Sequence, residues 1–119
     1  MSAESAVYSA LSASAGLAAL VGVRIYPDVL PEEAIYPAVV FARSRTERIV
    51  SISNIDYGSD VAIQVSAWAE NRTACDAAAV AVDAALLSAG ILPVGRQSGY
   101  DDEAGLHASV IEVQILEQP

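Results

Sequence analysis

The chain has 119 residues, the usual size of one domain, and a domain of this length buries about two-thirds of the surface that its unfolded chain exposes. Its 15 acidic residues outnumber its 6 basic residues, which are all arginines. The resulting net charge of -9 disfavours binding to DNA phosphates and to anionic membrane surfaces, so we expect a single domain over residues 1–119 that assembles with other protein chains.

Cysteine usage and the N-terminal segment indicate a reducing compartment. Cys75 is the only cysteine, so it has no internal disulfide partner and no cysteine-histidine cluster is present to hold zinc. The N-terminal segment lacks a basic region and contains Glu4, which argues against a secretory signal. Asp83 interrupts the alanine-rich segment, so no apolar run reaches the length of a membrane span.

The first third of the chain is predicted to contain two helical pieces and a connector. Apolar residues recur at helical spacing over residues 3–21, with Ser14 as a second N-cap and Gly22 as the stop. Three prolines between residues 27 and 37 exclude long regular structure from the connector. One short strand is expected there, at residues 24–26.

Alternating side chains predict two strands, at residues 38–50 and 61–69, that form an antiparallel hairpin. The segment between them is rich in residues that favour turns: Asn54, Asp56, Gly58 and Asp60. We therefore expect a long loop between the two strands.

A further helix is expected over residues 73–89, with Asn71 or Thr73 as its N-cap and Gly90 as its left-handed stop. The apolar stripe of this helix consists of Cys75, Ala78, Ala79, Val82, Ala85 and Leu86. This stripe predicts one face that packs on a sheet.

The last two strands are expected near residues 91–97 and at residues 106–117, joined by a polar loop. A helix between two hairpins has one face to bury, so the predicted fold is α+β: a four-stranded, mainly antiparallel sheet with two helices packed on one face. The other sheet face carries Gln64, Ser66, Trp68, Glu112 and Gln114. Trp68 on that face is interpreted either as solvent-exposed or as a contact with a partner chain.

No residue pattern indicates catalysis, a cofactor or a metal site. His107 is the only histidine, and no motif marks a serine as a nucleophile, so a structural role for His107 is favoured. The seven glycines form no phosphate-binding loop, and Cys75 on an apolar helix face is expected in the core. The acidic run at residues 101–103 has the ligands of a hard cation such as calcium, but it matches no defined calcium loop, and a solvated hairpin tip is favoured.

Charged strand residues provide the candidate contacts between copies. Arg43 and Arg45 are expected on one strand face, with Arg48 on the other. They either protect an edge strand from aggregation or dock onto the acidic run of a neighbouring copy, and both interpretations stay open. In the second interpretation, Arg43→Glu with Arg45→Glu leaves the fold intact and abolishes assembly. The candidate inter-subunit residues are Arg43, Arg45, Arg48, Trp68, Asp101, Asp102 and Glu103.

One stretch carries a family resemblance. Residues 20–27 (LVGVRIYP), Leu30-Pro31 and residues 36–41 (YPAVVF) resemble the opening of the small tail completion, or tail terminator, proteins of tailed bacteriophages and prophages. Later features that agree are Ala67-Trp68-Ala69, the helix end at Leu86-Leu87 and the hairpin residues Gly99-Tyr100.

The resemblance implies a structural virion protein without catalytic residues or cofactors. Such a protein forms a ring, usually hexameric, at the head-proximal end of the tail tube, where it ends tube polymerisation and provides the head-docking surface. The implied partners are further copies of the chain, the major tail tube protein and the head connector, while genomic DNA passes through the lumen without specific binding. The implied location is the virion tail, assembled in the cytoplasm of the bacterial host.

Three other interpretations are weighed against this one. The first is another virion part, either a different head-tail connector or a tail tube subunit. The second is a small-molecule-binding regulatory domain with a ferredoxin-like sheet, which needs a concave apolar pocket with convergent polar groups. An enzyme is the weakest of the three.

Overall fold

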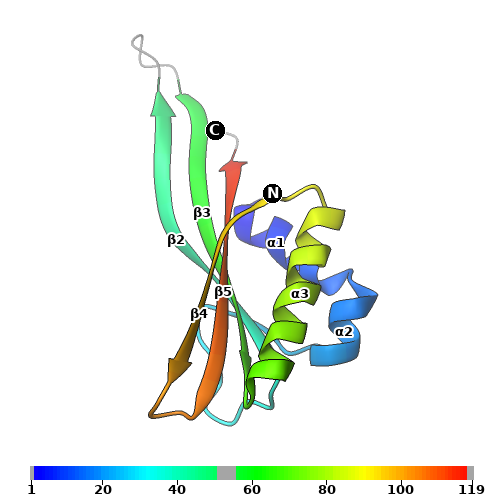
Figure 1. Ribbon diagram of the computed structural model, residues 1–119. Helices are drawn as coiled ribbons and strands as arrows, with labels where there is room; N and C mark the ends of the chain where they lie inside the picture. Colours follow the sequence, from blue (N-terminus) through cyan, green and yellow to red (C-terminus); the bar gives the residue numbers. More distant parts are fainter. Residues whose placement is uncertain (1, 51–55, 118–119) are drawn as a thin grey trace.

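The computed structural model describes residues 2–50 and 56–117, in which three helices cover one face of a twisted sheet (Figure 1). The molecule is elongated, with principal extents of 52 × 30 × 23 Å. The helices are α1 (Ala3–Ser12), α2 (Ala15–Val21) and α3 (Arg72–Ser88). The strands are β1 (Ile25–Pro27), β2 (Ala38–Val50), β3 (Asp56–Ala69), β4 (Pro93–Asp101) and β5 (Leu106–Glu117).

The break between α1 and α2 comes from a new N-cap at Ser14. Its hydroxyl accepts a hydrogen bond from the backbone N–H of Leu17 at 3.2 Å, and Gly22 ends α2 at a φ of 59°. Both predictions for this region are confirmed. Within the described residues, no single helix has the length and apolarity to cross a membrane; α1 and α2 meet that criterion only as a pair, with an 82° bend between them.

Helix α3 begins and ends one residue earlier than its predicted range of 73–89, and its N-cap and glycine stop are among the residues that the sequence indicates. The Asn71 side chain accepts a hydrogen bond from the N–H of Ala74 at 2.8 Å, so Asn71 and not Thr73 is the N-cap. At the other end, Gly90 adopts a φ of 79°. The N–H of Ile91 reaches back to the carbonyl of Leu86 at 2.9 Å, which closes a Schellman motif.

The sheet has five strands in the order β1-β2-β3-β5-β4, and it is mixed. The predicted four-stranded sheet with two helices is therefore wrong in detail, although the α+β class is confirmed. The additional strand is β1, whose Ile25 pairs in parallel with Val39. A strand of three residues has too few side chains to show which strand it pairs with, so its place in the sheet was not predicted. The additional helix, α2, results from the break at Ser14.

Strand β3 begins earlier than predicted. Asp56, Gly58 and Asp60 lie in the strand instead of a turn. Strand β2 continues far enough to pair Glu47 with Asp60 and Val50 with Asp56, and the register shifts between these two pairs. Asn54 lies outside the described residues. The pairing of two long strands therefore overrides the local turn preference.

Strand β4 also differs from its predicted position, since it occupies Pro93–Asp101 instead of residues 91–97. Its last residues pair with the start of β5, and Tyr100 lies opposite His107. These side chains are exposed on an edge strand, so the sequence has no apolar alternation there that would mark a strand.

The core lies between the helices and the sheet. Leu11, Leu17, Ile63, Leu86 and Ile111 come from five different elements, and all are at most 1% exposed. Cys75 is buried as predicted, and its burial raises the pKa of the thiol. The small residues on the buried face of α3 allow the helix backbone to lie close to the sheet.

Candidate assembly surfaces

The structure separates Arg43 and Arg45, which were predicted to share a strand face. A bulge at this point shifts the register of β2, so Arg43 lies opposite Ile63 on the helix-covered face. Arg45 lies opposite Ala62 on the open face. A bulge inserts one extra residue and reverses the alternation beyond it, which the sequence pattern does not reveal. Arg48, opposite Ser59, lies on the same side as Arg43.

Arg43 is held inside its own chain by two carboxylates. Its guanidinium Nη2 contacts Glu4 Oε1 at 2.5 Å and Glu117 Oε2 at 2.6 Å. The same Glu117 oxygen accepts a hydrogen bond from the backbone N–H of Ala3 at 2.8 Å. We call Glu4, Arg43 and Glu117 the terminal clamp, because they join the first helix, β2 and the last strand. No sequence signal could have found it, since its members are far apart in the chain.

The terminal clamp shifts the pKa values of its carboxylates. The hydrogen bond from Arg43 is the main reason why the pKa of Glu4 lies below its ordinary value. The pKa of Glu117 is lowered first by the N–H of Ala3 and then by Arg43. The two carboxylates in turn raise the pKa of Arg43. Ionised Arg43 and each ionised carboxylate therefore stabilise one another in the folded state, while the two carboxylates repel each other more weakly.

These shifts predict how stability depends on pH. A carboxyl whose pKa is lower in the folded than in the unfolded protein stabilises the fold above its unfolded pKa, and this contribution is lost as pH falls through the folded pKa. We expect the free energy of unfolding to fall as pH drops below about 4.5, the ordinary value for a glutamate. Urea unfolding of Glu4→Gln with Glu117→Gln checks this, because that variant should lose stability less steeply in acid. An equal acid slope in both proteins would contradict it.

Arg43→Glu is expected to destabilise the fold, in contrast to the expectation drawn from the sequence. It would place three carboxylates together and leave the N-terminal helix without its ionic tie to β2. The cost should be about 1–2 kcal/mol, since the side chain is 28% exposed and partly screened by water. Chemical unfolding measures it. Arg43→Glu combined with Glu4→Gln should recover part of the loss, and no recovery would argue against the ionic origin.

The strands β2 and β3 continue past the helical layer (Figure 1). Strand β5 accompanies β3 as far as Glu117, opposite Ser59, and only the part beyond this point is two-stranded. We call residues 44–50 and 56–60 the arm. Residues 44–50 are all exposed. Arg45, on the open face of the arm, contacts Glu47 at 2.7 Å and Asp60 at 3.8 Å, yet its side chain remains 47% exposed. Among the described residues, Arg45 has no core contacts to give up, so its side chain is free to contact another chain.

The acidic run forms the turn between β4 and β5, at the end of the sheet opposite to the arm (Figure 1). Asp101 Oδ1 accepts hydrogen bonds from the N–H groups of Glu103 and Ala104 at 3.0 and 3.3 Å, so this carboxylate shapes the turn. Asp102 and Glu103 are exposed. Within residues 2–50 and 56–117 there is no group of three histidine, cysteine or acidic side chains placed to hold a metal ion.

Trp68 lies on the helix-free face and is half-buried. Its indole N–H donates a hydrogen bond to the hydroxyl of Ser66 at 3.1 Å. Its cross-strand neighbours are Ala38 and Ala108, which are nearly inaccessible although no helix covers them. Trp68 therefore already covers small residues of its own sheet, and only its exposed part is available to a partner.

His107 is placed by a ring contact with Tyr100, at a centroid distance of 4.8 Å. Its Nδ1 atom is buried and has no hydrogen-bond partner among the described residues. Both rings belong to the β4–β5 hairpin, and the structure brings the imidazole beside an aromatic ring at the sheet edge.

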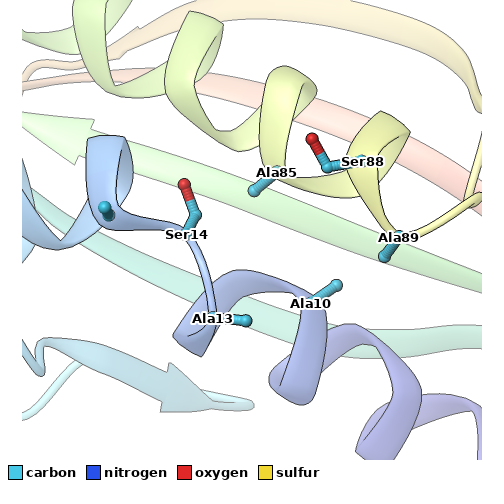
Figure 2. A pocket seen from close by; sticks show the side chains of 7 residues that line it. Ala10, Ala13, Ser14, Ala85, Ser88 and Ala89 are labelled. Atoms are coloured by element: carbon cyan, nitrogen blue, oxygen red, sulfur yellow. The ribbon is translucent and has the colours of Figure 1, made fainter.

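A shallow depression of about 370 Å³ lies where the α1–α2 corner meets the end of α3 (Figure 2). Figure 2 shows Ala85 and Ser88 of α3, and its C-cap residue Ala89, across from Ala10 and Ala13. The Ser14 hydroxyl in its wall already caps α2. The complete lining is Ala10, Ala13, Ser14, Ala15, Ala85, Ser88 and Ala89, with no charged side chain. This volume lies within the range of small-molecule pockets, but the convergent polar groups of a regulatory ligand site are not part of its lining.

The molecule is a small α+β protein whose mixed sheet is covered by helices on one face. The arm lies at one end of the sheet and the acidic turn at the other, so both ends carry charged side chains (Figure 1). The chain matches the model of the tail completion protein gp17 family over residues 5–118, and it therefore belongs to that family. It is a structural protein of a bacteriophage tail, as the resemblance of residues 20–41 implies.

The fold also occurs in a solved particle structure. A chain of the structure described as the virion of native gene transfer agent (GTA) particle matches with a TM-score of 0.75 and 22% sequence identity. The match covers 98% of this chain and 95% of that chain. Comparison with curated protein sequences finds no significant match.

Proposed function

We propose that the chain closes the head-proximal end of the tail tube as a ring, usually of six copies, which ends tube polymerisation and provides the head-docking surface. The observation that carries this proposal is the match to the tail completion family over nearly the whole chain, residues 5–118. The partners are further copies of the chain, the major tail tube protein on one side and the head connector on the other. The ring is assembled into the tail in the cytoplasm of the bacterial host.

The shape of the molecule supports a ring over a symmetric dimer. A ring needs two different patches on each copy, which meet head to tail with a rotation that closes. The arm and the acidic turn are two such patches, and they lie at opposite ends of the sheet (Figure 1). Arg45 on the arm and Asp102 on the turn supply opposite charges.

The net charge agrees with a lumen through which DNA passes without binding. At -9 per copy, a ring carries an excess of negative charge that repels phosphate groups. This arrangement allows the genome to pass without a specific protein contact.

Deletion and electron microscopy test the proposal. Lysates made without the chain should contain full heads that are not joined to tails, and the tails should vary in length. When purified chain is added, it should appear as one ring at a single end of each tail. Long tubes formed by the purified chain alone would instead identify a tube subunit. Normal head-tail joining without the chain would overturn the proposal, and a small-molecule ligand with a strong thermal shift would favour the regulatory alternative.

A further inference from the structure

The sheet ends in two strand edges that face away from each other. Strand β4 has β5 as its neighbour on one side only. On the other edge, β1 covers β2 only from Val39 to Phe41. Within the described residues no strand lies beside residues 44–50 of β2 on their outer side. Each copy therefore presents two unpaired edges of similar length, on opposite sides of one sheet.

Long exposed edges are templates for pairing with another chain, and proteins commonly protect them with charges or prolines. From Gln97 to Tyr100, β4 carries no charged side chain. Its Arg96 is occupied within the chain, with Nε at 3.3 Å from the Ser109 hydroxyl. The Arg72 guanidinium donates one hydrogen bond to the Gly99 carbonyl at 3.0 Å. Apart from this contact, the middle of β4 has little protection against pairing.

We propose that β4 of one copy pairs with residues 44–50 of β2 in the next copy, so that the sheets join into one continuous barrel around the ring. This inference rests on the proposed function, because it assigns the contact that closes the ring. The occupant of each edge is a second copy of this chain.

Within one copy, the two unpaired edges lie at different positions along the strand direction. Through the strand registers, Gln97 is level with Ser66 and Val40, whereas Glu47 is level with Asp60. The two levels are separated by six residues of β3, which is about 20 Å. Copies must therefore be staggered along the strand direction by about this amount for β4 to reach residues 44–50.

A stagger of this size is what closure of a barrel requires. Tilted strands in a barrel need a fixed offset as the sheet closes, and strand tilts are typically about 35–45°. Each copy contributes four full strands, β2, β3, β5 and β4, which span about 19 Å across the sheet. An offset of about 20 Å over a width of about 19 Å corresponds to a tilt of about 45°. Unstaggered copies would instead place β4 against β1.

Charge complementarity supports the same pairing. In an antiparallel alignment with Gln97 opposite Glu47, the acidic end of β4 at Asp101 lies beside residues 43–45 of the next copy. Asp101 pairs with Leu106 and Arg45 with Ala62, and both pairs belong to the open face. The pairing therefore places a carboxylate and a guanidinium on one face across the contact.

Disulfide trapping in assembled tails tests the proposal. Gln97→Cys combined with Glu47→Cys should form disulfides between copies on mild oxidation. Within one copy the two positions are three strands and six residues apart, about 14 Å and 20 Å, which is far beyond the Cα separation of a disulfide. Buried Cys75, whose thiol pKa is raised, should not react.

The matched control is Gln97→Cys with Tyr26→Cys. Tyr26 is on β1 at the same level as Gln97, on the other sheet edge, so it reports unstaggered contact. A ladder of covalent oligomers for the Glu47 pair and none for the Tyr26 pair is expected. Two results would overturn the edge pairing: disulfides in the Tyr26 pair, or disulfides in neither pair. If electron micrographs of the same tails still show the ring, the proposed function stands. Tails without a ring overturn both.

Discussion

Leu86→Ala is expected to lower the free energy of unfolding by about 2–5 kcal/mol, as large-to-small substitutions at fully buried sites do. Leu86 has no exposed surface and belongs to the core cluster that joins α3 to the sheet. Its carbonyl also accepts the hydrogen bond from Ile91 that ends the helix, and Ile91 packs against the same cluster. Truncation therefore leaves a cavity at the point where the chain turns from α3 toward β4.

Chemical unfolding of Leu86→Ala beside Leu87→Ala measures this effect against a matched neighbour. Leu87 follows Leu86 directly but is 49% exposed, so its truncation should cost less than about 1 kcal/mol. Similar losses for both variants would mean that the helix faces are not oriented as described.

Arg45→Glu is expected to abolish head-tail joining while leaving the fold intact. The side chain is 47% exposed and contacts only nearby acidic residues of the arm, so its contribution to stability should be below about 1 kcal/mol. At a contact with the acidic turn, however, the reversal replaces attraction by repulsion between like charges. Thermal unfolding checks the fold, and complementation of a deletion checks joining.

A charge swap provides the control for Arg45→Glu. Adding Asp102→Arg to the same chain restores opposite charges between neighbouring copies, because every copy carries both changes, and joining should return. Normal joining by Arg45→Glu alone would remove Arg45 from the interface. Loss of joining that the swap does not restore would contradict a contact between the arm and the acidic turn.

The candidate site was only partly accessible to sequence reasoning. Charge and turn propensity located the exposed acidic turn, because three adjacent carboxylates are rarely buried. The same reasoning treated Arg43 and Arg45 as one patch. The bulge in β2 separates them, and Glu117, which is 74 residues from Arg43 in the chain, then binds Arg43 inside the molecule.

The sequence by itself determined the features that depend on neighbouring residues. Ser14 and Asn71 as N-caps, Gly22 and Gly90 as stops, and the buried stripe of α3 all follow from contacts within about five positions. These features are readable because the backbone groups at a helix end, and the spacing of a helix face, are satisfied locally.

Only the tertiary structure decided the parallel pairing of β1, the length of the arm, the faces of Arg43 and Arg45, and the terminal clamp. Each depends on a strand register or on side chains brought together from distant segments. A shift of one residue in register moves a side chain to the opposite face of a sheet, and local side-chain preferences do not encode that shift. The arm and the separation of its arginines are therefore products of strand pairing, and they are the features on which the proposed ring contact depends.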